Sequence, residues 1–386
     1  MINLHFAFNI NTSFDVIKSE EYSNVVERAY KPLLNCLREL GIKSTIFPTG
    51  NSLERLSNEF PDVIGLLKDL VQENLVEIGN HTYGHPIIPL ISDFDFEKQI
   101  EFSQKIEKDL FGFHSNGFYP PEFCIDPTIP YYLKKNGLDW ILLHCSNFMN
   151  CYDHQPEDIF KVGIMKGIKN SEMKVLTIYG DADEWIKGQL HGVFEGVLSP
   201  KKFSEDLTSR LLKETHKLDF TPNLILYTDS ETPFFNQDSF NPHPLENFKR
   251  AIDYMLNNNS FRIVSASDIF NDKTTSDIEI KFKMRSTYKP FDIWTIGSEK
   301  LDYLINETRP LVYQVTKTKP NDFRVNEMWK FYLISQISDA RSNFSERRLE
   351  VRKIGRQMRS GVHDRTLQAY DDIIQAKELA LEILNG

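Results

Sequence analysis

Two histidines stand four residues apart in the stretch EIGNHTYGHP (77–86), directly after a short apolar segment. On a turn or a short helix, this spacing places the rings of His81 and His85 on one side. There they can bind zinc with a third protein ligand and leave a position for water. The same rings can instead donate hydrogen bonds to the hydroxyl groups of a sugar. A structural interpretation is also open, in which both rings are buried and bonded to backbone carbonyl groups.

Two acidic residues follow apolar or aromatic segments with little basic charge beside them. Glu122 ends the segment NGFYPPE, and Asp229 ends NLILYTD. Two carboxylates in one cleft are what cleavage of a glycosidic bond requires. One attacks the anomeric carbon or stabilises its charge, and the other stays protonated to release the leaving group. The alternative is that each acid caps a helix or is solvated, which is common for acids at strand ends.

Four further residues are candidates for substrate contact. His5 lies in the first apolar segment, and Glu77 precedes the two histidines. Trp185, in the polar stretch GDADEWIKG, can stack on a sugar ring. Asp339 lies in a largely apolar helical pattern, where it either pairs with a local arginine such as Arg341 or points into a cleft between domains.

The elements that must position these residues alternate along the chain. Helical patterns lie between short apolar segments, for example in 20–41, and Asn51 with Glu54 forms a capping box that predicts the start of another helix. Strands are predicted within 2–8, 43–50, 75–79, 116–122, 138–144, 173–180, 223–229 and 261–270. This alternation predicts a parallel sheet covered by helices, and its length favours a barrel. The C-terminal ends of barrel strands meet at one edge, where reactive groups collect.

The pattern changes after about residue 271. A charged segment leads into long helical patterns that continue to the last residues of the chain. We therefore predict a catalytic barrel over 1–275, with an elaborated loop region at about 146–200, and a smaller helical domain over 276–386.

Composition restricts the class of protein. The chain has 386 residues, 40% of them hydrophobic, and a net charge of −10 with both signs mixed along it. This charge argues against nucleic acid or an anionic membrane as the main partner. No signal peptide is recognised at the N-terminus and no apolar stretch approaches the roughly 18 residues of a membrane span, so we expect a cytoplasmic protein. Its four cysteines show neither CxxC spacing nor a dense disulfide framework.

Six segments resemble, in order and spacing, those of glycoside hydrolase family 57. They are AYKPLLNCLRELGIKSTIF, EFPDVIGLLKDLVQENLVEI, PIIPLIS, GFYPPE, LILYTDSE and LISQISDA. The resemblance covers most of the chain. It implies a distorted (β/α)7 barrel followed by a smaller C-terminal helical domain. It also implies activity on α-glucans or related α-linked sugars, with retention of anomeric configuration and without a metal.

The same resemblance implies roles for single residues. Glu122 matches the nucleophile, Asp229 the acid/base, Glu77 the glutamate of the second motif, and Asp339 the polar residue that the helical domain supplies. The family usually opens with a histidine pair in a pattern like HFHQP. The chain has HFAFN (5–9), which keeps the first histidine and has alanine in place of the second.

A second resemblance is local. The stretch EIGNHTYGHP is similar to the zinc-binding histidine motif of the polysaccharide deacetylases of carbohydrate esterase family 4, which have a related barrel. Those enzymes also need two adjacent aspartates at the end of the first strand, where the chain has Asn9 and Ile10. Their third motif carries an arginine where the chain has Tyr119. His5 is available to complete a set of three histidines.

The combined prediction is a retaining, family 57-like enzyme that acts on an α-linked poly- or oligosaccharide without a cofactor. Glu122 and Asp229 carry the chemistry, and His81 and His85 line the sugar site with Glu77. Water and a sugar hydroxyl compete for the same intermediate, so hydrolysis and transglycosylation both stay open. Two alternatives are a zinc-dependent deacetylase that uses His81 and His85 and a catalytically inactive carbohydrate-binding protein on the same fold.

Overall fold

The computed structural model describes residues 1–12, 22–151, 153–179, 192–193, 196, 198–231, 244–257, 259–281, 291–341 and 361–386. Within these ranges, seven parallel strands form a closed ring. In ring order they are β1 (Ile2–Ile10), β2 (Ser44–Pro48), β3 (Val76–Ile78), β4 (Gly117–Phe118), β5 (Trp140–His144), β7 (Glu172–Ile178) and β8 (Asn223–Asp229). Each predicted strand segment that contributes to the ring is confirmed.

The ring closes between β3 and β4 through Asn80. Its backbone N–H donates to the carbonyl of Gly117 (2.8 Å), and its carbonyl accepts from the N–H of Tyr119 (2.9 Å). Its side-chain amide donates to the buried carboxylate of Glu107 (2.8 Å). Because β3 and β4 are so short, these bonds to one residue complete the barrel at this point.

The barrel is distorted at β7. This strand joins β8 through a single residue pair, Ile178 and Ile225. Most of that edge pairs instead with the antiparallel strand β6 (Val162–Lys166), which in turn pairs with β10 (Asp277–Ile280). The short strand β9 (Phe261–Ile263) pairs with the first residues of β1. The result is a distorted (β/α)7 barrel, as the sequence predicted, with strand pairing that continues beyond residue 275.

Strand β1 is buried on both faces. Because successive side chains point to opposite sides, one set meets the helices and the other the barrel interior. Leu4, Phe6 and Phe8 pack outward against the surrounding helices. Ala7 points inward and belongs to a cluster with Phe47 and Trp140 that fills the barrel interior. The covering helices are α1 (Tyr22–Val25), α2 (Lys31–Leu40), α3 (Gly50–Glu59), α4 (Pro61–Gln72), α5 (Asp93–Phe111), α6 (Ile129–Lys135), α8 (Pro200–Thr215), α10 (Pro244–Leu256) and α11 (Ala266–Asn271).

The predicted capping box at Asn51 is wrong. Helix α3 already begins at Gly50, and its N-cap is Thr49, whose hydroxyl accepts from the N–H of Ser52 (3.2 Å). Strand β2 ends at Pro48, so one residue connects strand and helix and must itself serve as the cap.

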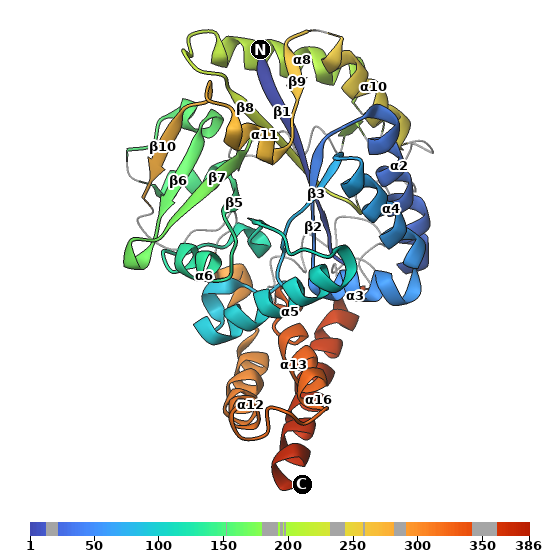
Figure 1. The fold of residues 1–386 in the computed structure, drawn as a ribbon, viewed down its shortest axis with the longest axis vertical. Helices are drawn as coiled ribbons and strands as arrows, with labels where there is room; N and C mark the ends of the chain where they lie inside the picture. The colour runs from blue at the N-terminus through green and yellow to red at the C-terminus, as the bar shows by residue number, and fades with distance from the viewer. Residues whose placement is uncertain are drawn as a thin grey trace.

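A helical region lies beyond the C-terminal ends of the strands (Figure 1). It contains α12 (Glu299–Thr318), α13 (Val325–Ile334), α14 (Ser338–Arg341) and α16 (Gly361–Asn385), which share their own hydrophobic core. Helix α5 lies at the junction, where it contacts α13.

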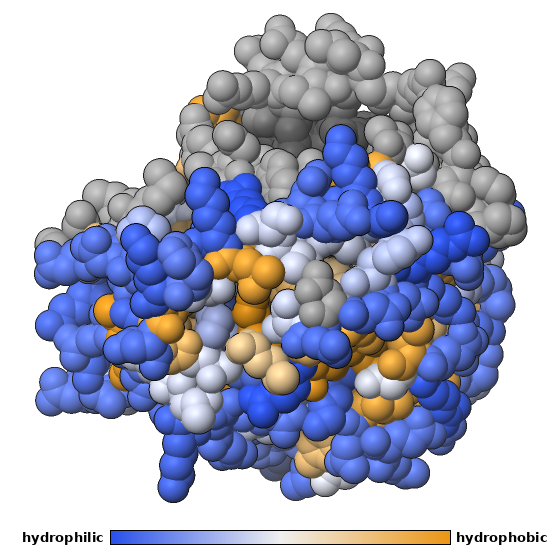
Figure 2. Space-filling view, turned by 90° about the horizontal axis from the view of Figure 1, so that it is seen from above, coloured by the Kyte–Doolittle hydropathy of each residue, from blue (hydrophilic) through white to orange (hydrophobic). Residues whose placement is uncertain are grey.

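The opposite end of the barrel, where the strands begin, is seen in Figure 2. The described side chains on this face are mostly hydrophilic, with apolar residues scattered among them. Of the helices in the described ranges, none combines the length and the apolar character needed to cross a membrane.

Candidate active site

Four of the predicted site residues meet where the barrel strands end. His81 and His85 follow β3, Glu122 follows β4, and Asp229 is the last residue of β8. The two imidazole rings meet edge to face with centroids 4.5 Å apart. The charges of Glu122 and Asp229 both act on His85, and that of Asp229 also acts on His81. The structure therefore brings two histidines and two carboxylates from three strand ends into one site.

His81 is fully buried and held in one orientation. Its ring stacks on Tyr119 with centroids 4.1 Å apart and planes 5° apart. Its Nδ1 lies 2.7 Å from the carbonyl oxygen of Tyr119, so Nδ1 carries the hydrogen. Burial holds the pKa of His81 well below its usual value, and the ring is neutral at pH 7. Nε2 is then a hydrogen-bond acceptor, and it has no hydrogen-bond partner in the part of the chain that the structure describes.

Glu122 and His85 both have left-handed backbone conformations. The φ angle is 56° at Glu122 and 55° at His85, and Phe123 follows with 50°. Such angles in residues other than glycine cost on the order of 1–3 kcal/mol each and persist where the surrounding structure holds them. In Glu122 this conformation directs a side chain from the turn after β4 into the site.

Asp229 is held by a chain of phenol groups. The hydroxyl of Tyr227 donates to Asp229 Oδ1 (2.8 Å). Because that hydrogen is used, the hydroxyl of Tyr119 is the donor to Tyr227 (3.0 Å). Burial raises the pKa of both tyrosines well above 10, so both remain donors at neutral pH. Tyr119 thus contacts both His81 and, through Tyr227, the acid at the end of β8.

Asp339 reaches the site from the helical region. It is buried, with 3% of its surface exposed, and accepts a hydrogen bond from Asn11 Nδ2 (3.4 Å) at the end of β1. Arg341, the local partner considered from the sequence, forms an ion pair with Asp302. Asp339 therefore bonds a residue of the barrel, and the prediction that it contacts substrate stays a prediction.

A third acid beside the site was not among the predicted residues. Glu231 follows Asp229 by two residues and is fully buried. Its Oε1 accepts from the hydroxyl of Tyr30 (2.5 Å) and from the N–H of Asn11 (3.0 Å). Tyr30 ends a π-helical turn (Val26–Tyr30), a local irregularity that is frequent near functional sites. The sequence did contain a sign of this. Glu231 lies two residues after Asp229, and residues two apart in an extended segment point to the same side.

The predictions for His5 and Glu77 require correction. Both lie mid-strand, below the edge that carries the site. His5 is wholly buried, with Nδ1 bonded to the carbonyl of Val264 (2.9 Å) and Nε2 to the hydroxyl of Thr45 (3.1 Å). Glu77 accepts from the N–H of Ser267 (3.3 Å).

An aromatic layer separates these residues from the site. Gly79 lies just after β3, between Glu77 and His81 in the sequence, and a Cβ at Gly79 would overlap the ring of Phe47. The Phe47 ring in turn contacts Tyr119 and Trp140 edge to face, with centroids 5.8 and 5.6 Å away. The structure therefore does not group Glu77 with the two histidines.

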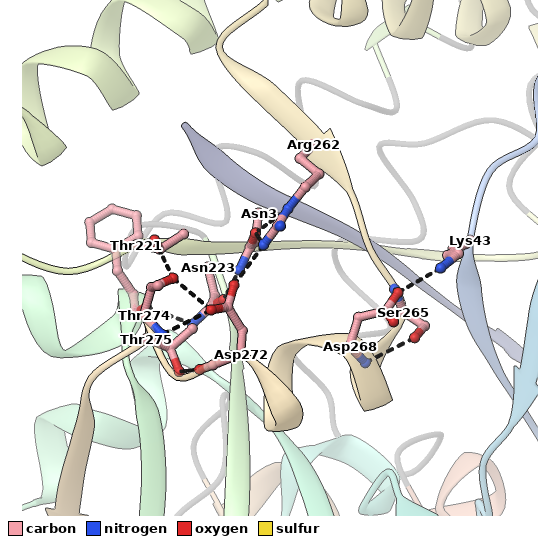
Figure 3. Close-up of polar contacts among 11 residues, drawn as sticks. Asn3, Lys43, Thr221, Asn223, Arg262, Ser265, Asp268, Asp272, Thr274 and Thr275 are labelled. Atoms are coloured by element: carbon pink, nitrogen blue, oxygen red, sulfur yellow. Dashed lines mark hydrogen bonds and ion pairs between the residues drawn. The ribbon is translucent and has the colours of Figure 1, made fainter.

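Glu77 instead faces a cavity of about 600 Å³ at the end of the barrel where the strands begin. Lys43 and Asp268 line this cavity and form an ion pair (2.7 Å), which Figure 3 shows. In the same view Arg262 bonds Asn3 (2.7 Å) and pairs with Asp272 (2.6 Å), so polar contacts tie β9 and α11 across this end.

The residues that reach the site edge here are Asn9, near the end of β1, and Asn11, just after it. Asn9 pairs in register with Asp229, and both asparagines are buried. They are two residues apart, the spacing of the histidine pair expected at this strand. The predicted alignment on HFAFN placed that pair four residues too early along β1, because His5 and Ala7 lie deeper in the barrel.

Trp185 lies outside the described residues. The predicted loop region at about 146–200 is described only in part. It contains the 3-10 helices η5 (Cys145–Asn150) and η6 (Pro156–Phe160) and the strands β6 and β7. The described residues contain no group of three or more His, Cys, Asp and Glu side chains arranged to hold a metal ion. The histidine pair alone does not fit the three protein ligands of a catalytic zinc site.

Comparisons with known proteins agree with this geometry. The model of the family described as glycosyl hydrolase family 57 matches residues 9–278. An alpha-amylase from Pyrococcus horikoshii is 26% identical over 156 residues, which are 39% of this chain and 24% of that protein. A GH57-type branching enzyme from Pyrococcus horikoshii shares the fold, with a TM-score of 0.74 and 15% identity over 99% of this chain and 93% of that one.

A local match to another activity was also found. A peptidoglycan-N-acetylglucosamine deacetylase from Bacillus cereus is 30% identical over 108 residues, which are 28% of this chain and 34% of that protein. The chain thus spans about a quarter of the curated amylase and about a third of the curated deacetylase that it matches.

Proposed function

This chain belongs to glycosyl hydrolase family 57, and from that premise we propose that it cleaves an α-linked glucan or related glycan with retention of anomeric configuration. Glu122 is the nucleophile and Asp229 the acid/base. The observation that carries the proposal is the placement of these two carboxylates at the ends of β4 and β8, where both act on the neutral ring of His85.

The proposed reaction has two steps. In the first, the Glu122 carboxylate attacks the anomeric carbon while protonated Asp229 gives its hydrogen to the leaving oxygen. In the second, Asp229 as carboxylate takes a proton from the incoming hydroxyl, which displaces Glu122 and regenerates the acid. Water as the acceptor gives hydrolysis, and the hydroxyl of a second glycan gives transglycosylation.

The surrounding groups support sugar binding in this proposal. Neutral His81 presents Nε2, an acceptor to which a sugar hydroxyl can donate. Asp339 from the helical region and Asn11, just after β1, add further polar groups. An oligosaccharide is therefore the proposed ligand.

The test uses Glu122→Gln and Asp229→Asn with a panel of α-glucans. We expect both variants to lose at least about 1,000-fold in kcat on natural α-glucans while melting at the wild-type temperature. For wild type, proton NMR of the first product should show the α anomer. A β anomer as first product would contradict retention, and turnover by Glu122→Gln would contradict its role.

A further inference from the structure

Ser338 connects the helical region to the proposed nucleophile. It opens α14, and its side chain is fully buried. Its Oγ lies 2.8 Å from Nδ1 of His85 and donates to Oε1 of Glu122 at 3.3 Å. The residue comes from a segment 216 positions beyond Glu122. It lies in the segment LISQISDA beside Asp339, but the sequence does not show which barrel residues its side chain meets.

The direction of the two hydrogen bonds follows from the available hydrogens. An ionised carboxylate can only accept, so the single hydroxyl hydrogen of Ser338 goes to Glu122. Nδ1 of His85 must then carry the hydrogen that it shares with Ser338 Oγ. Burial lowers the pKa of His85, so the ring is neutral and its Nε2 is the acceptor. The contacts therefore form a directed chain from His85 through Ser338 to Glu122.

We propose that Ser338 is a positioning residue for the reaction, which orients the Glu122 carboxylate for attack as the central member of this chain. The proposal rests on the function proposed above. A hydrogen bond to an ionised group is stronger than one between neutral groups, and it restricts the rotation of the carboxylate about its last bond.

The backbone around Ser338 fixes its position against the barrel. Its N–H donates to the carbonyl of His85 (2.9 Å), and Ile337 forms a bridge with Pro86. Gly84 approaches the end of α13 closely, because a Cβ at Gly84 would lie 2.5 Å from the carbonyl oxygen of Leu333. The serine hydroxyl is therefore delivered by a rigid contact between the helical region and the loop after β3.

The hydrogen bonds of Ser338 also join two residues with left-handed backbone conformations, His85 and Glu122. Both residues are strained, and strain of this kind persists where partners hold it. Ser338 contacts the side chains of both. It thus connects the two strained turns that follow β3 and β4.

The central experiment compares Ser338→Ala with a matched control, Ser335→Ala. Ser335 is also fully buried and lies three residues earlier, but its hydroxyl donates to the carbonyl of Tyr332 (2.8 Å). We expect Ser338→Ala to lower kcat by about 10- to 100-fold with little change in KM, because the bond orients the nucleophile without contacting the sugar. Ser338→Thr, which keeps the hydroxyl, should recover most of the loss. Equal kcat values for Ser338→Ala and Ser335→Ala would overturn the proposal.

A second measurement does not depend on turnover. Nitrogen-15 NMR of the His85 ring in the wild-type chain reports which nitrogen carries the hydrogen. We expect Nδ1 to be protonated, with its signal displaced in Ser338→Ala and unchanged in Ser335→Ala. A His85 ring protonated only at Nε2 would contradict the proposed hydrogen bonds from His85 through Ser338 to Glu122. This result needs only the wild-type protein, so it holds even if Ser338→Ala fails to fold. If wild type turned over no α-glucan, the proposed function would fail. The NMR result would still decide whether the hydrogen bonds from His85 through Ser338 to Glu122 are present.

Discussion

Among single residues, Glu231 has a protonation state that is unusual for its type. Its carboxyl is fully buried and accepts hydrogen bonds from Tyr30 and from the backbone of Asn11. Burial, and secondarily the charge of Asp229, raises the pKa of Glu231 to about 8. The folded protein therefore holds a proton on Glu231 at neutral pH, directly beside the proposed acid/base.

This proton makes stability depend on pH. The pKa of Glu231 is higher in the folded chain than in the unfolded chain, so its contribution is complete below about pH 4.5 and is lost as the pH rises to about 8. Glu231→Gln keeps the shape and cannot ionise. Relative to this variant, wild type should lose up to about 1.4 kcal/mol of unfolding free energy per pH unit across that window. Urea denaturation between pH 5 and 9 measures the difference, and parallel curves for the two proteins would contradict the prediction.

At the scale of elements, helix α5 fastens the helical region to the barrel. Asp95 in its first turn is fully buried and accepts hydrogen bonds from Arg309 (3.1 Å) and Tyr313 (2.8 Å) of α12. It also accepts from Tyr332 (3.0 Å) in α13 and from Gln336 (3.2 Å) just after it. Every one of these donors belongs to the helical region, so one carboxylate holds the segment that carries Ser338 and Asp339.

Gln99, one turn further along α5, extends this contact to the site. Its Nε2 donates to the carbonyl of Leu333 (2.9 Å), and its Oε1 accepts from the N–H of Gly84 (2.7 Å). The same side chain therefore bonds α13 and the loop that holds His85. Movement of the helical region would displace both the loop and Ser338.

Asp95→Asn tests this attachment. The variant removes the charge that pairs with Arg309 and leaves buried donors without a full acceptor, so we expect a loss of about 3–5 kcal/mol in stability. Hydrogen exchange should accelerate most in α12 and α13. Asp109→Asn, at an exposed position of the same helix, is the control and should change neither quantity. If exchange in Asp95→Asn accelerated equally in the barrel and in the helical region, the prediction that Asp95 mainly attaches the helical region would be wrong.

In the whole molecule, the barrel and the helical region both contribute residues to the candidate site, and the proposed glycosidase differs from the deacetylase alternative in what it needs from that site. Two histidines are present, but Asn9 stands at the end of β1, where a deacetylase needs a carboxylate. Among the described residues, no group of three or more His, Cys, Asp and Glu side chains is arranged to hold a metal ion.

Metal removal is the corresponding measurement. After dialysis against a chelator, we expect less than about 0.1 zinc per chain and unchanged turnover of α-glucans, since no proposed step uses a metal. His81→Ala is the control for any zinc that remains. About one zinc per chain, lost together with activity in His81→Ala, would favour the deacetylase alternative.

The sequence predicted the barrel well because its signals are local. Alternation of apolar residues and turn signals set each strand, and the position of Glu122 or Asp229 after a strand follows directly from that pattern. How deep each residue lies along the barrel axis was harder to predict from the sequence. Glu77 in β3 and Gly79 and His81 after it are spaced by two residues, so the pattern alone does not show that Phe47 separates Glu77 from the site.

Local sequence patterns were enough to predict the barrel strands, the family, and the strand-end positions of Glu122 and Asp229, but not those of Asn9 and Asn11. Tertiary structure alone decided that Asp339 faces Asn11 while Arg341 pairs with Asp302, and that Ser338 meets Glu122. The physical reason is the range of the interactions. Strand and helix formation depends on neighbours within a few residues, whereas the partners of a buried polar group are set by which distant segments pack around it.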